Sequence, residues 1–188
     1  MLFNFLYLLF FLINPFVTDT KPTASGGEDG IIWTNNRRLT WDDFKSEAAE
    51  NESLHAMTST NIAVKAQCYG NLMRYDIKCV FVTKDSWTKN RSSKKLLEHE
   101  QMHFDLTEIH ARLLRQKLNE TAGLCGTSRI KLDAVVEKYF NEWKKEQDQY
   151  DEETNHGLIE DKQKLWAETI QNRLFKLDAF SYKTYALK

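Results

Sequence analysis

The stretch LEHEQMHFD, residues 97–105, decides how the rest of this chain can be interpreted. Two histidines four residues apart, His99 and His103, lie on one face of a helix, and Glu100 follows the first of them. This HExxH spacing is typical of zinc hydrolases, in which the histidines bind the metal and the glutamate acts as a base on a water between them. We therefore expect His99 and His103 as metal ligands and Glu100 as the catalytic base.

The residues around this motif predict a long helix. Residues 94–119 contain neither proline nor glycine, and leucines and histidines recur through them at helical spacing. Ser92 or Ser93 is a suitable N-cap, and the helix should end near residues 121–123, Thr-Ala-Gly. The motif thus falls in the early part of a regular helix, as metal binding by both histidines requires.

The order of the other predicted elements indicates an α+β fold. Two stretches of alternating apolar residues flank Gly70-Asn71, which predicts a β-hairpin. Strands come first and helices follow, which is typical of helices packed on one face of a small antiparallel sheet. The HExxH helix would then be the active helix of a zincin-like domain. The expected elements are a short strand at 31–33, an aromatic turn at 39–44, the hairpin at 59–81, and three long helices at 94–119, 128–148 and 158–177.

A third metal ligand must come from elsewhere in the chain, because catalytic zinc has three protein ligands and one open position. The first helix continues about 16 residues past His103, and the second returns about 20 residues, or roughly 30 Å. This return brings residues 150–156 level with the motif. We choose His156 as the third ligand. The alternatives are Asp151, Glu153 and, only if the first helix breaks early, Glu108.

Other polar residues near the motif are predicted not to bind the metal. His110 shares a face with His103 but lies seven residues on, about 10 Å further along the helix axis. Asp105 and Glu108 point away from the histidine pair and are expected to support or pack the helix. Tyr150, on the returning segment, is a candidate for stabilising an oxyanion.

The N-terminal residues 1–24 predict an export signal or an N-terminal anchor. Their apolar run, residues 2–13, is too short for a typical membrane-spanning helix and fits a signal peptide, although no lysine or arginine precedes it. Cleavage would give a secreted or periplasmic protein, and an uncleaved segment would anchor it to the membrane. Residues 25–30 read as a glycine-rich linker to a single domain at 31–188.

The composition limits the possible partners and cofactors. A net charge of −1 gives no support for a nucleic-acid or anionic-membrane partner. The zinc-hydrolase motif predicts a peptide or protein substrate. Three cysteines, Cys68, Cys79 and Cys125, lack the CxxC spacing of a zinc or redox site. If Gly70-Asn71 is the hairpin turn, Cys79 lies opposite a residue near 62 and out of register with Cys68. We expect free, buried thiols.

Several further stretches make the chain resemble a known family. They are RLTWDDF at 38–44, AMTST at 56–60, Ser86-Trp87, and Tyr150-Asp151 with Thr154-Asn155-His156. With the His-Glu-Gln-x-His-Phe-Asp motif, they resemble a bacterial family of predicted secreted zinc-dependent proteases, long catalogued as a domain of unknown function. The resemblance covers residues 33–175, with Met102 as a mild departure. It implies an exported metallopeptidase-like domain that binds Zn²⁺, and it supplies no substrate.

The sequence therefore favours an exported zinc metallopeptidase, with two alternatives left open. The first is a non-catalytic zinc-binding module of the cell envelope. The second is a zinc amidase or peptidase that acts on cell-wall peptides. Glu100 argues against the first, because a purely structural zinc site has no use for a base beside its first ligand.

Overall fold

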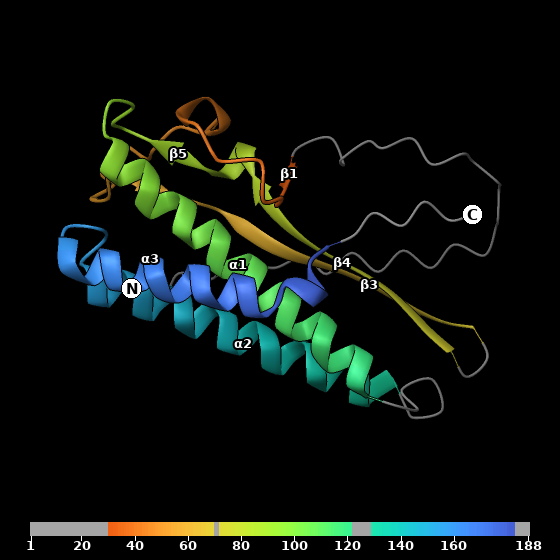
Figure 1. Ribbon diagram of the computed structural model, residues 1–188. Coiled ribbons are helices and arrows are strands. Elements are labelled where there is room, and N and C mark those ends of the chain that lie inside the picture. The colour runs from red at the N-terminus through yellow and green to blue at the C-terminus, as the bar shows by residue number, and fades with distance from the viewer. Residues whose placement is uncertain (1–29, 70–71, 122–128, 183–188) are drawn as a thin grey trace.

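The computed structural model describes residues 30–69, 72–121 and 129–182. The expected α+β order is confirmed, since small antiparallel sheets precede three helices (Figure 1). Residues 1–24, for which an export signal or anchor is predicted, lie outside the described residues, as do most of the predicted linker and Cys125. The helices are α1 (Lys94–Glu120), α2 (Arg129–Thr154) and α3 (Glu160–Lys176), and the strands are β1 (Gly30–Ile32), β2 (Ala56–Met57), β3 (Thr60–Tyr69), β4 (Leu72–Val82) and β5 (Trp87–Thr88). In the described part of the chain, no helix combines the length and hydropathy needed to cross a bilayer.

The sheet is built on the β3–β4 hairpin, with β1 on the other side of β4. Ile62 pairs with Cys79, as predicted from a turn at Gly70-Asn71, and Cys68 pairs with Met73. Cys79 is a free, buried thiol, and its Sγ donates to the Phe104 carbonyl at 3.6 Å. A second sheet, which the sequence did not predict, joins β2 to β5.

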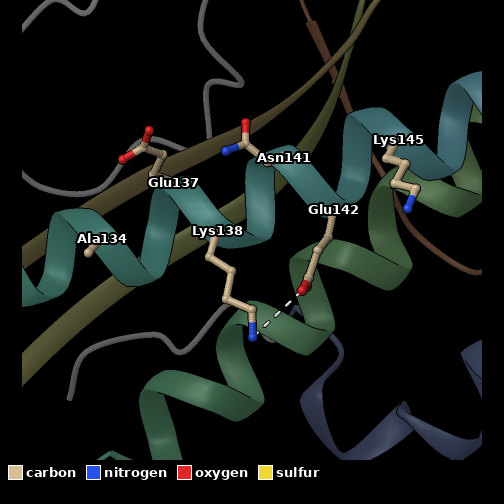
Figure 2. A pocket seen from close by; sticks show the side chains of 6 residues that line it. All are labelled: Ala134, Glu137, Lys138, Asn141, Glu142 and Lys145. Atoms are coloured by element: carbon tan, nitrogen blue, oxygen red, sulfur yellow. Dashed lines mark ion pairs between the residues drawn. The ribbon is translucent and has the colours of Figure 1, made fainter.

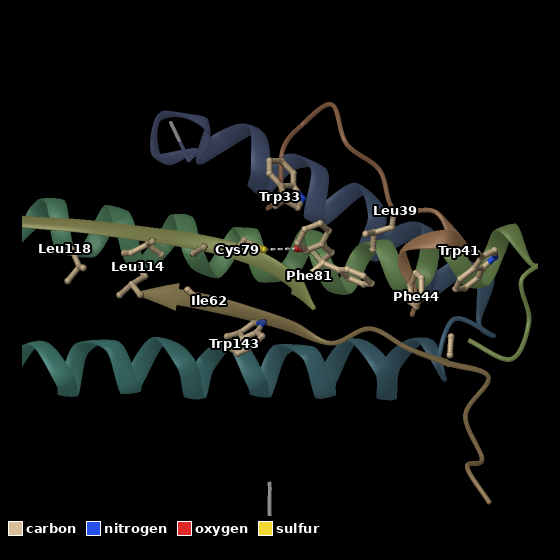
Figure 3. Packing of buried hydrophobic residues seen from close by; sticks show 14 residues of the cluster. Trp33, Leu39, Trp41, Phe44, Ile62, Cys79, Phe81, Leu114, Leu118 and Trp143 are labelled. Carbon is tan, nitrogen blue, oxygen red and sulfur yellow. Dashed lines mark hydrogen bonds between the residues drawn. The ribbon is translucent and has the colours of Figure 1, made fainter. Parts of the chain in front are cut away.

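Helix α1 is the centre of the fold, with the sheet on one side and the other two helices on the other (Figure 1). Ser93 caps it by accepting a hydrogen bond from the Leu96 amide at 3.1 Å, as expected for a serine N-cap. Its apolar side chains join two clusters. The larger one fills the space between the sheet, α1 and α2 (Figure 3), where the Phe81 ring lies 5.8 Å from Phe104. The smaller one lies among the three helices and includes Leu106, Tyr150 and Trp166.

The polar residues that follow the first motif histidine fasten α1 to the N-terminal segment. Asp105 accepts hydrogen bonds from the Trp33 indole at 2.7 Å and from Gln101 at 2.8 Å, and it pairs with Arg38 at 3.1 Å. Gln101 in turn accepts the Leu39 amide at 2.7 Å. Gln101 and Asp105 therefore hold the helix in place, and Asp105 faces away from the histidine pair as predicted.

A buried charge network secures the middle of α1. The Glu108 carboxylate accepts hydrogen bonds from Arg112 at 2.9 Å and Arg115 at 2.9 Å. Arg115 also donates to the Ile77 carbonyl of β4, and Arg112 to the Leu174 carbonyl of α3. All three charged side chains are buried. This network ties α1 to the sheet and to α3, and it uses Glu108 fully, so that residue is not available as a metal ligand.

Helix α2 ends six residues later than predicted, at Thr154. The apolar periodicity that marked it ends at Trp143. Beyond Trp143 the face of α2 that packs against α1 meets polar side chains. Gln147 and Asp151 lie on this face, at positions that are apolar earlier in the helix, and both contact His103. The extension places Tyr150 and Asp151 on a helix instead of a loop.

Candidate metal centre

Two imidazoles and one carboxylate converge on a single point between α1 and the end of α2. The Nε2 atoms of His99 and His103 lie 3.2 Å apart. The Oδ1 atom of Asp151 lies 3.1 Å from the first and 3.0 Å from the second. The estimate from helix lengths, which brought residues 150–156 level with the motif, agrees with this arrangement.

His156 reaches the same cluster from the turn that follows α2. Its Nδ1 lies 3.4 Å from Asp151 Oδ1, and one donor atom from each of His99, Asp151 and His156 falls within 4.8 Å of the others. These three residues could therefore hold a metal ion. His99 is 2% exposed and His156 is 49% exposed, so the cluster runs from the protein interior to the surface.

Glu153, a further alternative for the third ligand, does not join the cluster. Its carboxylate accepts hydrogen bonds from the Trp166 indole at 2.9 Å and from Gln149 at 2.7 Å. His110 is also separate, since its Nε2 lies 2.6 Å from Glu146. The separation of His110 agrees with its position about 10 Å further along the α1 axis than His103, and Glu153 lies two residues after Asp151 and so on a different face of α2.

An unusual turn presents His156. Asn155, His156 and Gly157 all have left-handed backbone conformations, with φ of 47°, 52° and 81°. Residues other than glycine rarely adopt such φ angles. The two non-glycine residues in this turn therefore carry backbone strain, which the surrounding contacts must offset. The Thr154 hydroxyl contributes by accepting the Gly157 amide at 3.2 Å.

Gly157→Ala is expected to distort the cluster of His99, His103, Asp151 and His156. A Cβ at this position would lie 3.0 Å from both Cβ and Cγ of His99, and the backbone has a φ that disfavours alanine. We expect weaker zinc binding and a lower melting temperature, measured by chelator competition and by circular dichroism. Ser53→Ala, at an exposed position across the cleft, serves as a control. Wild-type zinc affinity in Gly157→Ala would show that His99 is not held against this glycine.

The electrostatics of the cluster favour a positive charge at its centre. Burial alone would raise the pKa of Asp151, but the hydrogen bonds with His103 and His99 hold it well below its usual range. Burial alone would lower the pKa of His103, but the Asp151 carboxylate outweighs it and the pKa is raised. A proton or a metal cation at the centre would satisfy the carboxylate and both imidazoles.

The cluster opens into a cleft of about 1030 Å³. One wall is formed by residues 53–60, which include β2, and the other by the end of α2 and residues 156–158. Glu100 is buried at the edge of this cleft beside His99 and His103. Within the described residues its carboxylate has no hydrogen-bond partner in the protein, which leaves it able to bind a water in the cleft.

The Tyr150 ring packs against both histidines of the HExxH motif. It stacks on His99 with centroids 4.7 Å apart and meets His103 edge-on at 4.9 Å. The Tyr150 hydroxyl accepts a hydrogen bond from Gln163 Nε2 at 2.6 Å and donates one to the His99 carbonyl at 3.4 Å. Burial raises the pKa of this hydroxyl far above its usual range. In this position Tyr150 is a packing residue, and the predicted oxyanion role would require the hydroxyl to leave both partners.

A second hollow, of about 460 Å³, lies on the outer face of α2 (Figure 2). Its lining residues follow one side of the helix, and Lys138 and Glu142 form an ion pair at 3.6 Å. The described residues that line it include no histidine or cysteine, and their acidic side chains do not converge on one point. It is a solvated helix surface, which leaves the cleft at the histidine cluster as the candidate functional site.

Two glutamines that were not predicted from the sequence contact the histidines of the cluster. Gln147 of α2 lies against His103, and Gln163 of α3 against His99. One signal was available for Gln147, which precedes Asp151 by four residues and therefore shares its helix face. For Gln163 the sequence offered none, because its position depends on how α3 packs.

Fold and site together define an α+β domain in which an HExxH helix meets a carboxylate from the following helix. The family model described as "Bacterial protein of unknown function (DUF922)" matches residues 45–157. This match spans more than half of the chain and includes every residue of the cluster, so the protein belongs to this bacterial family. No curated protein and no solved structure matches the chain.

Proposed function

We propose that this protein is an exported zinc-dependent metallopeptidase whose reaction takes place in the cleft beside the histidine cluster. One observation carries the proposal: His99, His103 and Asp151 converge at one point, and Glu100 lines the same cleft. A base beside a metal-binding cluster, at the edge of an open cleft, is what hydrolysis requires and what a purely structural site lacks.

The separations among the donor atoms fit zinc. Tetrahedral zinc with bonds of about 2.0–2.1 Å places neighbouring ligand atoms about 3.3 Å apart. The three separations among His99, His103 and Asp151 lie between 3.0 and 3.2 Å. Two imidazoles and one carboxylate also form a ligand set known from catalytic zinc sites.

Asp151 is the better choice for the third ligand, because its Oδ1 is close to both Nε2 atoms. His156 was the first choice from the sequence, with Asp151 as an alternative. The Nδ1 atom of His156 lies close to Asp151, but the His156 side chain is half exposed and comes from a strained turn. We propose that Asp151 completes the three-ligand site and that His156 flanks the open position.

The roles of the residues then follow from their places. Zinc, when bound, supplies a Lewis acid that polarises the scissile carbonyl and lowers the pKa of a water. Glu100 accepts a proton from the attacking water and transfers it to the leaving amine as the C–O bond forms and the C–N bond breaks. Gln101 and Asp105 keep the helix in register, so that Glu100 stays at the cleft.

The shape of the cleft supports a peptide as substrate. Strand β2 lines it and, among the described strands, pairs only with β5. Its other edge can accept main-chain hydrogen bonds from an extended peptide, which would add to the small sheet as a further strand. A cell-wall peptide could bind to this edge in the same way. An amidase or peptidase that acts on cell-wall peptides is therefore the second candidate function.

Zinc analysis combined with two digestion assays tests the proposal. Purified protein should contain one zinc per chain and should cleave casein or the peptide cross-links of peptidoglycan. Cleavage of peptidoglycan alone would identify the cell-wall alternative. One bound zinc without cleavage of either substrate would favour the non-catalytic envelope module.

Two substitutions test the third ligand. Asp151→Ala should lower zinc affinity by more than the roughly 100-fold that loss of an outer hydrogen-bonding partner can cost, whereas His156→Ala should lower it less. Chelator competition measures both affinities. Glu153→Ala, from the same segment but outside the cluster, should bind zinc like the wild type. A larger loss in His156→Ala than in Asp151→Ala would return the third-ligand role to His156.

A further inference from the structure

Each histidine of the HExxH pair has a glutamine on the ring nitrogen that faces away from the cluster. For His103, the Nδ1 atom lies 2.6 Å from Oε1 of Gln147. For His99, the Nδ1 atom lies 3.3 Å from Oε1 of Gln163. The two glutamines come from different helices, α2 and α3, so the pair of rings is held from two sides.

The orientation of the Gln147 amide is fixed by its other contacts. Its Nε2 donates to the His103 carbonyl oxygen at 3.0 Å and to the Thr107 hydroxyl at 3.0 Å. A carbonyl oxygen can only accept, so a flipped amide would set two acceptors against each other. The amide oxygen must therefore face the imidazole, and Nδ1 of His103 must carry the hydrogen.

Thr107 is itself held in place by three elements. It donates to the His103 carbonyl at 2.8 Å, accepts from the Trp143 indole at 3.1 Å, and meets the Thr60 hydroxyl at 2.8 Å. The contact with Gln147 thus belongs to a network that joins α1, α2 and β3. Such a network leaves the amide little freedom to turn.

Gln163 is oriented in a similar way. Its Nε2 donates to the Tyr150 hydroxyl at 2.6 Å and faces the Met102 sulfur at 3.2 Å, an atom that can only accept. Tyr150 passes its own hydrogen to the His99 carbonyl at 3.4 Å. The amide oxygen of Gln163 is left to face Nδ1 of His99.

We infer that Gln147 and Gln163 are positioning residues that fix both histidines in the Nδ1–H tautomer and so direct the two Nε2 lone pairs at the metal position. A neutral imidazole has one donor and one acceptor nitrogen, so a hydrogen on Nδ1 leaves Nε2 free to bind a cation. The metal part of this inference rests on the proposed function. The hydrogen on Nδ1 does not, because the contacts with the two glutamines require it. With that hydrogen in place, the contacts of both Nε2 atoms with Asp151 Oδ1 need a cation, either a proton or a metal ion, between them.

The use of neutral amides has a further consequence. Histidine ligands in zinc sites usually donate to a carboxylate, a backbone carbonyl or water, and a carboxylate makes the imidazole a stronger base. Here the amides orient the rings without adding negative charge. The negative charges close to the metal position are then those of Asp151 and Glu100.

Isosteric substitutions test the inference. Gln147→Met and Gln163→Met keep the approximate side-chain shape and remove the acceptor. Gln163→Glu keeps an acceptor for His99 and also accepts the Tyr150 hydroxyl. Gln149→Met, at an exposed position on α2, is the matched control. The readouts are zinc affinity by chelator competition and the imidazole tautomer of the metal-free protein, from ¹⁵N–¹H correlation spectra recorded above the imidazole titration.

We expect both methionine variants to bind zinc about 10- to 100-fold more weakly, while Gln163→Glu stays near the wild type. In the metal-free protein, His103 should lose its Nδ1–H preference only in Gln147→Met, and His99 only in Gln163→Met. Unchanged tautomers and affinities in both methionine variants would overturn the inference. If the wild type bound no zinc, the proposed function would fail, and the tautomer spectra would still decide this point.

Discussion

Glu100→Gln is expected to abolish peptide hydrolysis while the protein keeps one zinc per chain. The amide has nearly the shape of the carboxylate and cannot accept a proton from water. General base catalysis contributes about 10²- to 10⁴-fold to rates, and here the same group also returns the proton to the leaving amine, so a loss at the upper end is expected. Glu100 belongs to the cleft and not to the donor cluster, so metal binding should be unaffected.

Initial rates of casein or peptidoglycan cleavage, measured on zinc-loaded protein, test this prediction. Glu98→Gln provides a matched control, because Glu98 lies two residues earlier on α1 and its side chain is exposed. The control should retain the wild-type rate. A Glu100→Gln variant as active as the wild type would show that Glu100 is not the base.

Glu108→Gln is expected to cost about 3–5 kcal/mol of unfolding free energy, the largest stability effect that we predict. Glu108 is fully buried and neutralises both Arg112 and Arg115, whose other hydrogen bonds go to backbone carbonyls. Among the described residues, removing its charge leaves Arg115 in the interior without a counter-ion and leaves Arg112 with only Asp178, an exposed carboxylate 3.7 Å away. That cost is far greater than the loss of an exposed ion pair.

Urea unfolding followed by tryptophan fluorescence, with a chelator present so that zinc does not contribute, measures the change. Glu98→Gln again serves as the control and should unfold like the wild type within about 0.5 kcal/mol. An equally small effect for Glu108→Gln would mean that the arginines find other partners or water, and that this network does not stabilise the fold.

The helical positions of the site could be predicted because regular helices have a fixed rise. His99 and His103 share a face by their spacing alone, and the lengths of α1 and α2 bring residues 150–156 back to them. The hairpin register was equally predictable, since Gly70-Asn71 fixes Cys79 opposite Ile62. These features depend on local geometry that extends over many residues.

The choice between Asp151 and His156 could not be made in this way. It depends on where α2 ends, and three consecutive left-handed residues there turn His156 toward the cluster. A run of this kind has no periodic pattern to reveal it, and Gly157 alone indicates only a helix end. The pairing of β2 with β5 was missed for a related reason, because strands of two residues are too short to show alternation.

The support that Gln163 gives to His99 affects how this domain can be dissected. The family match ends at residue 157, so a fragment trimmed to that boundary would retain all four cluster residues, His99, His103, Asp151 and His156. It would lose α3, and with it the amide behind His99 and the indole of Trp166 that packs against Tyr150 at 5.4 Å. Residues just after α3 contribute too, because the Phe180 carbonyl accepts a hydrogen bond from Arg115 at 2.9 Å. The smallest unit worth expressing for biochemical work therefore extends through Phe180, well past the boundary that sequence similarity suggests.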